Sequence, residues 1–275
     1  MVVEPLKVAA SERPCFVAGV SPQLLFGPLG PPRSRVMSHL HLIALLSILG
    51  WAVGVRAETT LVEPPAGFRS LFNGQDLSGW RGRPHLDPRQ EVAGTPAERQ
   101  TRQANWDADL ATHWQVADGV IVSDGKGVFL TTEADHGDFE LLLEWMLPDP
   151  CADSGIYLRG NPQVQIWDPG CERDFRHGCE KGSGGLWNNP ADSPGKFPLV
   201  RADRPIGAWN VMRVRMVESR VTVELNDQIV VEDCPLANYF EPAAPLPARG
   251  PIQIQTHGAP MHVRNVFLRE FEPAP

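Results

Sequence analysis

The sequence predicts an all-β domain, a β-sandwich or jelly roll, with one polar helical or loop insertion at about residues 82–113. Short strand-like runs such as DFELLLEWML and WNVMRVRMV follow one another after residue 113. Gly, Asp and Asn separate these runs at short intervals, as they do in turns between antiparallel strands. Long helical periodicity is absent from this stretch, as are the G-x-G-x-x-G, Walker A and G-x-S-x-G motifs. Two packed sheets are therefore favoured over a Rossmann-type, P-loop or α/β-hydrolase fold.

The first 57 residues have the pattern of an export leader. Residues 42–55 read LIALLSILGWAVGV, an apolar run shorter than the roughly 20 residues of a membrane span. Small residues at Val55 and Ala57 fit a cleavage site that would start the mature protein near Glu58. Met37 is an alternative start, and residues 1–36 would then not belong to the protein. We expect an exported protein, periplasmic or extracellular, with a single N-terminal anchor as the alternative.

The mature chain, residues 58–275, is expected to form one domain that carries excess negative charge. Removal of residues 1–57 leaves 218 of 275 residues, enough for a substantial core. The leader contains five Lys or Arg and two Asp or Glu, so the formal net charge changes from −8 to −11. This charge argues against nucleic acid and anionic membrane surfaces as partners. We also expect no membrane insertion after cleavage of the leader.

Four cysteines remain after cleavage: Cys151, Cys171, Cys179 and Cys234. Four cysteines allow three pairings, and an exported protein is expected to use them as disulfides. Cys171 and Cys179 flank a short loop and are the preferred pair. A zinc site is disfavoured because the sequence has no C-x-x-C or H-x-x-x-H spacing.

The elements of the domain can be predicted in order. FRSLFNGQDLSGW opens it, with a tight turn at Asn73-Gly74. In the polar insertion, Thr95 and Pro96 are a plausible N-cap and first residue of a helix of about four turns. The strands that follow are WQVADGVIVSDG, GVFLTT, DFELLLEWML, SGIYLRG, VQIWD, WNVMRVRMV, RVTVELNDQIVVED, GPIQIQTHG and MHVRNVFLREF. The hairpin that turns at Asn226-Asp227 is interpreted as scaffold.

Alternation along the strands predicts one polar, aromatic face. In the hairpin around Asn161-Pro162, the apolar side chains Ile156, Leu158, Val164 and Ile166 point inward. If the strands share one sheet, its outer face collects Glu144, Tyr157, Arg159, Gln165, Trp167, Gln255 and His257. Flat rings can stack on a sugar, and amides can bind its neighbouring hydroxyls. The alternative is a face that the insertion covers.

Further candidates each have a structural alternative. Residues 182–190, GSGGLWNNP, would form a rim that presents Trp187 as a sugar platform beside Asn188, although packing explains such a Trp equally well. Asp168 ends its strand before Pro169 and could reach the site or cap a turn. Glu144 lies in an apolar strand, where a carboxylate needs a partner or a cleft. An ion pair with Arg159 is the structural explanation.

The ordered motifs FNGQDLSGW, DFELLLEW, DSGIYLRG with VQIWDP, GSGGLWNN, IGAWNVMRVRM, ELNDQIVV and IQIQTHG with VRNVFLRE extend over residues 67–271. In this order they resemble the 3-keto-disaccharide hydrolase domain family. The resemblance implies a concanavalin-like jelly-roll sandwich with a ligand site on the concave sheet. It also implies cleavage of glycosidic bonds in sugars oxidised at C3. The polar positions that it carries over are Glu144, Ser154, Arg159, Gln165, Asp168, Lys196, Gln255, His257 and Arg264. Two departures, Thr256 and the elaborated segment 171–181, bear on substrate choice.

Such chemistry implies roles for these residues. A C3 ketone acidifies the hydrogen on C2, and the enolate formed by its removal can expel the glycosidic oxygen before water adds. His257 or Glu144 would be the base, Arg159 and Lys196 the oxyanion donors, and Asp168 an acid or the ligand of a possible divalent metal. The alternatives are a two-carboxylate glycosidase, disfavoured because E-x-D-x-x-E is absent, and a non-catalytic carbohydrate-binding module.

Overall fold

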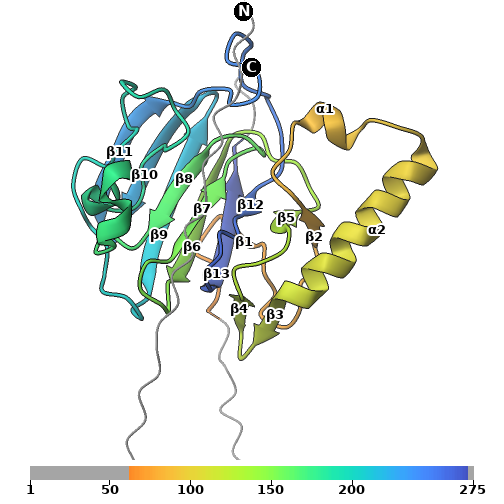
Figure 1. Cartoon of the computed structure of the whole chain (residues 1–275), viewed down its shortest axis with the longest axis horizontal. Coiled ribbons are helices and arrows are strands. Elements are labelled where there is room, and N and C mark those ends of the chain that lie inside the picture. Colours follow the sequence, from red (N-terminus) through yellow and green to blue (C-terminus); the bar gives the residue numbers. More distant parts are fainter. Residues whose placement is uncertain (1–61, 272–275) are drawn as a thin grey trace, which may run out of the picture. The chain divides into compact units, whose positions relative to one another are not determined.

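Two antiparallel β-sheets form the domain in the computed structural model, which describes residues 62–271 (Figure 1). The eight-stranded sheet has the order β11-β10-β9-β6-β13-β4-β3, with β1 paired to β13. The five-stranded sheet has the order β2-β5-β12-β7-β8. The predicted all-β sandwich is therefore confirmed.

Most strands lie within the predicted runs, but GPIQIQTHG is a strand only at Gln253–Ile254, and the strand Trp80–Arg83 ends inside the predicted insertion. The larger sheet contains β1 (Arg69–Ser70), β3 (Trp114–Ala117), β4 (Val120–Ser123), β6 (Phe139–Met146), β9 (Asn210–Val217), β10 (Arg220–Leu225), β11 (Gln228–Pro235) and β13 (Met261–Glu270). The smaller sheet contains β2 (Trp80–Arg83), β5 (Phe129–Thr132), β7 (Asp153–Tyr157), β8 (Gln163–Trp167) and β12 (Gln253–Ile254). The helices are α1 (Pro88–Glu91), α2 (Pro96–His113) and the 3₁₀ helices η1 (Glu172–His177) and η2 (Cys179–Lys181).

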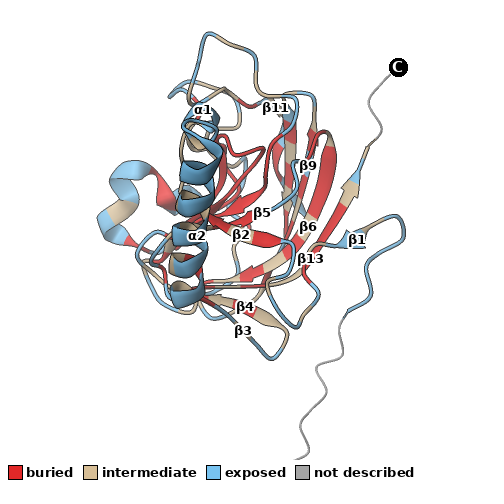
Figure 2. Cartoon of the chain, turned by 90° about the vertical axis from the view of Figure 1, so that its right-hand side faces the viewer, coloured by how far each residue is buried: buried red, intermediate tan, exposed pale blue. Residues whose placement is uncertain are grey.

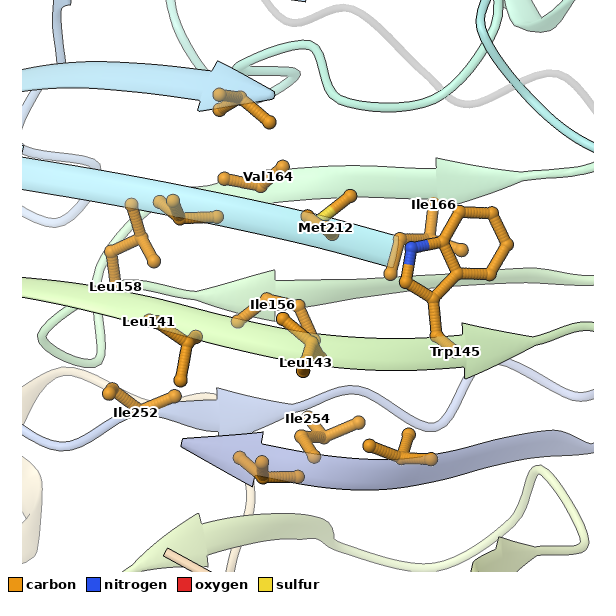
Figure 3. Close-up of a cluster of buried hydrophobic side chains, with 14 of the residues drawn as sticks. Leu141, Leu143, Trp145, Ile156, Leu158, Val164, Ile166, Met212, Ile252 and Ile254 are labelled. Carbon is orange, nitrogen blue, oxygen red and sulfur yellow. The ribbon is translucent and has the colours of Figure 1, made fainter. Parts of the chain in front are cut away.

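The core lies between the two sheets, where alternate residues of each strand meet (Figure 3). Leu141, Leu143 and Trp145 of β6 point toward Ile156 of β7 and Ile166 of β8. Successive side chains alternate across a strand, so the remaining residues of β7 and β8 lie on the opposite face of the smaller sheet. The predicted inward positions of the hairpin are confirmed.

The polar insertion forms α2, which lies along the β2 edge of the smaller sheet (Figure 1). Its start is the predicted one, because Thr95 and Glu98 form a capping box and Pro96 is the first helical residue. Asp107 accepts a hydrogen bond from the Gly82 backbone N–H at 2.9 Å. A side chain at Gly82 would place its Cβ 2.3 Å from the Trp106 carbonyl oxygen, so only glycine permits this approach. The helix thus closes an edge strand.

The disulfide joins Cys151 to Cys171, so the predicted Cys171–Cys179 pair is wrong. The Cα atoms of Cys151 and Cys171 lie 4.9 Å apart, within the range that a disulfide needs. Cys179 begins η2, where its buried thiol approaches the Cys171 carbonyl oxygen at 3.3 Å. Burial raises the pKa of this thiol to about 11. Within residues 62–271, Cys179 and Cys234 have no disulfide partner.

Removal of the disulfide is expected to destabilise the domain. Cys151 and Cys171 are separated by 20 residues, and closing a loop of that size stabilises a fold by about 3 kcal/mol. The variant with both cysteines replaced by serine should therefore show a lower free energy of unfolding in chemical denaturation. Cys234→Ser is the matched control and should remain close to the parent. Equal stability of the double variant and the control would contradict the assigned pairing.

The predicted leader, residues 1–57, lies outside the described residues. Among residues 62–271, no helix is both long and apolar enough to span a bilayer.

Candidate functional site

A polar face covers the side of the five-stranded sheet that points away from the core. Gln253 lies opposite both Thr131 and Tyr157, and Tyr157 lies opposite Gln163 on β8. Gly155 pairs with Gln165 and accepts a hydrogen bond from the Gln255 backbone N–H. We define the polar face by the residues Arg83, Thr131, Asp153, Tyr157, Gln163, Gln165, Gln253, Gln255 and His257.

At one end of the polar face, His257 and Asp153 form a dyad. Asp153 Oδ2 lies 3.2 Å from His257 Nδ1. Gln165 Nε2 donates to Asp153 Oδ1 at 2.6 Å, and Gln163 Nε2 donates to the Gln165 side-chain oxygen. The hydrogen bond to Asp153 raises the pKa of His257, against a smaller effect of burial. The histidine side chain is 59% exposed, so its second nitrogen can meet a ligand.

The helix η1 forms a wall beside this dyad. A depression of about 390 Å³ is lined by Asp153, Arg173, Asp174, Arg176 and His257. Arg173 donates to the Cys151 carbonyl at 2.9 Å, and the disulfide joins Cys151 to the residue that precedes η1. The disulfide therefore attaches η1 covalently to Cys151, two residues before Asp153. The elaborated segment 171–181 supplies both arginines.

Aromatic rings gather at the opposite end of the polar face. The centre of the His85 ring lies 4.2 Å from the ring centre of Tyr157, 5.3 Å from that of Tyr239 and 4.8 Å from that of Phe240. Burial and the nearby Arg83 charge lower the pKa of His85 to about 4, so the imidazole is neutral at pH 7. Burial also raises the pKa of Tyr157, which keeps its hydroxyl protonated.

Three buried polar atoms beside these groups have no hydrogen-bond partner within residues 62–271. They are His85 Nε2, Gln163 Oε1 and Gln255 Oε1. Buried polar groups are nearly always paired, so atoms left in this state are candidates for contact with a ligand or water. The polar face thus combines aromatic rings, an exposed histidine and polar atoms that have no partner in the described part of the chain.

Residues 67–269 match the model of the family described as the 3-keto-alpha-glucoside-1,2-lyase-like domain. The chain belongs to this family. Comparison with proteins of curated function finds no match to the sequence.

Solved structures similar to this chain include two from Parabacteroides distasonis, both described as candidate glycosyl hydrolases. The first is 21% identical, with a TM-score of 0.48, and the match covers 75% of this chain and 94% of that one. The second is 21% identical, with a TM-score of 0.42, and the match covers 70% of this chain and 99% of that one. A carbohydrate-binding module from Bacillus subtilis is 11% identical, with a TM-score of 0.36, and coverage of 55% and 86%.

In this 3-keto-alpha-glucoside-1,2-lyase-like domain, the polar face brings together four of the predicted site residues. They are Tyr157 and Gln165, as alternation along β7 and β8 predicts, and Gln255 and His257, which follow the end of β12 and reach the face beside Gly155 and Asp153. Ser154, also a family position, points to the other side of β7 and donates to the Gln255 carbonyl at 2.8 Å. Their functional roles stay predictions.

The predicted placement of Glu144 beside the β7–β8 hairpin is wrong. Glu144 lies on β6 of the other sheet, on the side opposite Leu143 and Trp145. Arg264 binds its carboxylate at 2.7 and 2.8 Å, and Asn265 donates to it at 2.7 Å. The eight-stranded sheet therefore separates Glu144 from His257, and the carboxylate has a structural partner already. Its position therefore does not support the predicted role as base, and that role stays untested.

Arg159 does not join the polar face either, and the predicted ion pair with Glu144 is wrong. β7 ends at Tyr157, and Arg159 adopts a positive φ of 53° in the turn, so strand alternation no longer applies. Its guanidinium binds Asp138 at 2.7 Å and donates to the Gly137 and Pro247 carbonyls.

Trp167 lies opposite Asp153 on the predicted outer side of the hairpin but is buried there, and Asp168 follows its structural alternative. Trp167 packs in a small cluster with the disulfide, and its ring N–H donates to the Gly182 carbonyl at 2.7 Å. Both carboxylate oxygens of Asp168 accept backbone N–H groups at 2.8 Å, from Cys151 and Gly170. Asp168 therefore caps the turn after β8.

The glycine-rich loop pairs with the edge of β8 instead of standing as a free rim. The Gln165 backbone N–H donates to the Gly185 carbonyl at 2.8 Å. Trp187 packs edge-on against Trp167 at 5.2 Å, and Lys196 donates to the Trp187 carbonyl at 2.6 Å. The Asn188 side-chain oxygen accepts from the Gln163 backbone N–H at 3.3 Å. These residues hold β8 in place, and Lys196 also donates to the Asn189 carbonyl at 2.9 Å; its role as an oxyanion donor stays a prediction.

Within the described part of the chain, no three His, Cys, Asp or Glu side chains are grouped to hold a metal ion. A divalent metal stays an untested prediction.

Proposed function

We propose that this domain cleaves a glycoside oxidised at C3 by removing the proton on C2. Membership of the 3-keto-alpha-glucoside-1,2-lyase-like family supports a carbohydrate-related function. The observation that carries the finer proposal is the exposed His257, held by Asp153, beside a face of amides and aromatic rings. An exported protein is part of this proposal.

His257 is proposed as the base. Its Nδ1 faces Asp153, so Nε2 is free to take the C2 proton. A ketone at C3 makes that hydrogen acidic, and Asp153 stabilises the imidazolium that forms. Gln165 holds the other carboxylate oxygen and so fixes the orientation of the pair.

The electron pair of the C2–H bond forms an enolate with its charge on O3. Arg173 and Arg176 line the same depression as His257 and are proposed to stabilise this charge. Collapse of the enolate forms a C1–C2 double bond and breaks the bond from C1 to the glycosidic oxygen. The imidazolium can return its proton to that oxygen. Addition of water then places hydroxyl on C1 and hydrogen on C2.

The aromatic rings at the other end of the polar face would hold the sugar unit that is not oxidised. Tyr239 is 48% exposed beside His85 and Tyr157, so its ring is available for stacking. Gln255 and Gln163 present side-chain oxygens that have no partner among residues 62–271 and can accept hydrogen bonds from hydroxyls.

The test is an NMR time course of the mature protein with a 3-keto-disaccharide, beside the unoxidised disaccharide, with and without added divalent metal. The proposal predicts cleavage of the keto sugar alone. Cleavage of both at similar rates would favour a two-carboxylate glycosidase. Binding of the disaccharide without turnover of either sugar would favour the carbohydrate-binding module.

The pH dependence of turnover is expected to follow the dyad. Hydrogen bonding to Asp153 raises the pKa of His257, and a base must be neutral to accept a proton. The value of kcat/KM should therefore increase with pH, and the midpoint of this increase should lie above 6.5, the usual pKa of histidine. Asp153→Asn should move the midpoint of this increase to lower pH and reduce the value of kcat/KM reached at high pH. A midpoint that does not move would contradict the dyad.

A further inference from the structure

A second cavity, of about 550 Å³, opens between α1, α2 and the segment 247–251. Its volume is in the range of small-molecule sites. Gly250 and Pro251 line it just before β12, whereas His257 follows β12. The cavity shares no lining residue with the depression beside the dyad, so the two sites are distinct.

The cavity is strongly basic in a protein of negative net charge. Six arginines line it: Arg81, Arg83, Arg99, Arg102, Arg159 and Arg249. The acidic residues of its lining are Glu91 and Asp135. The whole chain carries a formal charge of −8, so this concentration of positive charge runs against the composition. Such a concave basic region attracts anions.

Not all of these charges are neutralised. Arg81 and Arg83 share Glu91, at 2.6 and 2.5 Å. By contrast, Arg99 and Arg102 donate to backbone carbonyls near the start of α2. Neither has an ion-pair partner among residues 62–271. Arg102 Nε is also buried without a hydrogen-bond partner in that range. Two guanidinium groups are therefore available to an anion.

The same helix face supplies an aromatic ring. Arg99, Arg102 and Trp106 are spaced three and four residues apart, so they share one side of α2. The Arg102 guanidinium lies 5.5 Å from the centre of the Trp106 ring. Guanidinium groups bind carboxylate and sulfate in a fork, and an indole ring can stack on the apolar side of a pyranose. A free inorganic anion would need no such ring.

We propose that this cavity binds an acidic sugar, a carbohydrate with a carboxylate or sulfate group. Arg99 and Arg102 hold the anionic group, and Trp106 contacts the ring. The α2 insertion thus builds a second binding site as well as closing the β2 edge. The site goes beyond the proposed reaction and does not depend on it, because its test measures binding without turnover.

The test is calorimetric titration of the full mature protein with four probes. They are a disaccharide containing glucuronic acid, a sulfated disaccharide, the neutral disaccharide with glucose in place of the acidic sugar, and inorganic sulfate. An acidic disaccharide, carboxylated or sulfated, should bind at least about tenfold more tightly than the neutral one, as one charge-assisted hydrogen bond provides. Its affinity should also fall as salt is added.

The Arg99→Gln/Arg102→Gln variant should lose about tenfold or more in affinity for the acidic disaccharide. The matched control is Arg204→Gln with Arg220→Gln, which removes the same charge; Arg204 likewise donates to a backbone carbonyl. Trp106→Leu, with its fold checked by circular dichroism, should weaken the acidic disaccharide but leave sulfate unchanged. Equal affinity for acidic and neutral sugars, or an equal loss in the control, would overturn the site. Sulfate binding as tight as that of the acidic sugars would overturn its specificity for carbohydrate.

Discussion

His257→Ala is expected to lower kcat/KM on a 3-keto-disaccharide by about 10²- to 10⁴-fold, the usual contribution of a positioned general base. The imidazole is exposed and its Nδ1 lies 3.2 Å from Asp153, so the variant loses the base without removing core packing. The free energy of unfolding should stay within about 0.5 kcal/mol of the parent, as for most surface substitutions. Steady-state kinetics and chemical denaturation measure the two effects separately.

Glu144→Gln is the matched control for this experiment. Glu144 is bound by Arg264 and Asn265 on the other sheet, so its replacement should leave kcat/KM within a few-fold of the parent. A loss of turnover in Glu144→Gln, with full activity in His257→Ala, would reverse the assignment of the base.

The largest effect on stability is expected from Ile156→Ala. Ile156 is fully buried and lies between Ile254 on β12 and Val164 on β8, below the polar face (Figure 3). Truncation of a core isoleucine leaves a cavity and costs about 2–5 kcal/mol. Chemical denaturation should show a lower midpoint at an unchanged slope.

Ile229→Ala removes the same atoms from a surface position. Ile229 on β11 is 42% exposed, so its truncation should cost less than about 0.5 kcal/mol. Similar losses in both variants would mean that the region around β7 is not packed as described.

Local patterns in the sequence predict most of the fold. Alternation in DFELLLEWML identifies the buried side of β6, because the period of two is a property of the strand itself. The cap of α2 is equally local: Thr95, Pro96 and Glu98 lie within four residues of one another. Figure 2 shows the strands β2 and β5 largely buried and the polar helix α2 largely exposed.

Long-range pairing could not be predicted in this way. β6 and β7 are neighbours in sequence but belong to different sheets, which is why Glu144 was expected beside Tyr157. The strand β12 inserts between β5 and β7, where Gln253 meets Thr131 from a distant part of the chain. No local pattern specifies which sheet a strand joins.

Some of the site was within reach of sequence reasoning. Asp153 lies four residues before Tyr157, so the alternation that selects Tyr157 also places Asp153 on the same face. Arg159 fails because the chain turns into a positive φ directly after the strand. The aromatic group and the η1 wall depend on how loops fold over the sheet. Residues such as His85, Tyr239 and Arg176 carried no signal of their own in the sequence.

Loss of the C2 hydrogen before cleavage is the most direct test of the central proposal. A 3-keto-disaccharide with deuterium at C2 would be compared with its unlabelled form by NMR in ordinary water. Proton abstraction by His257 predicts slower cleavage of the labelled sugar and solvent hydrogen at C2 of the hydrated product. Equal rates, with deuterium retained at C2 when the glycosidic bond breaks, would contradict it and point to direct displacement at C1.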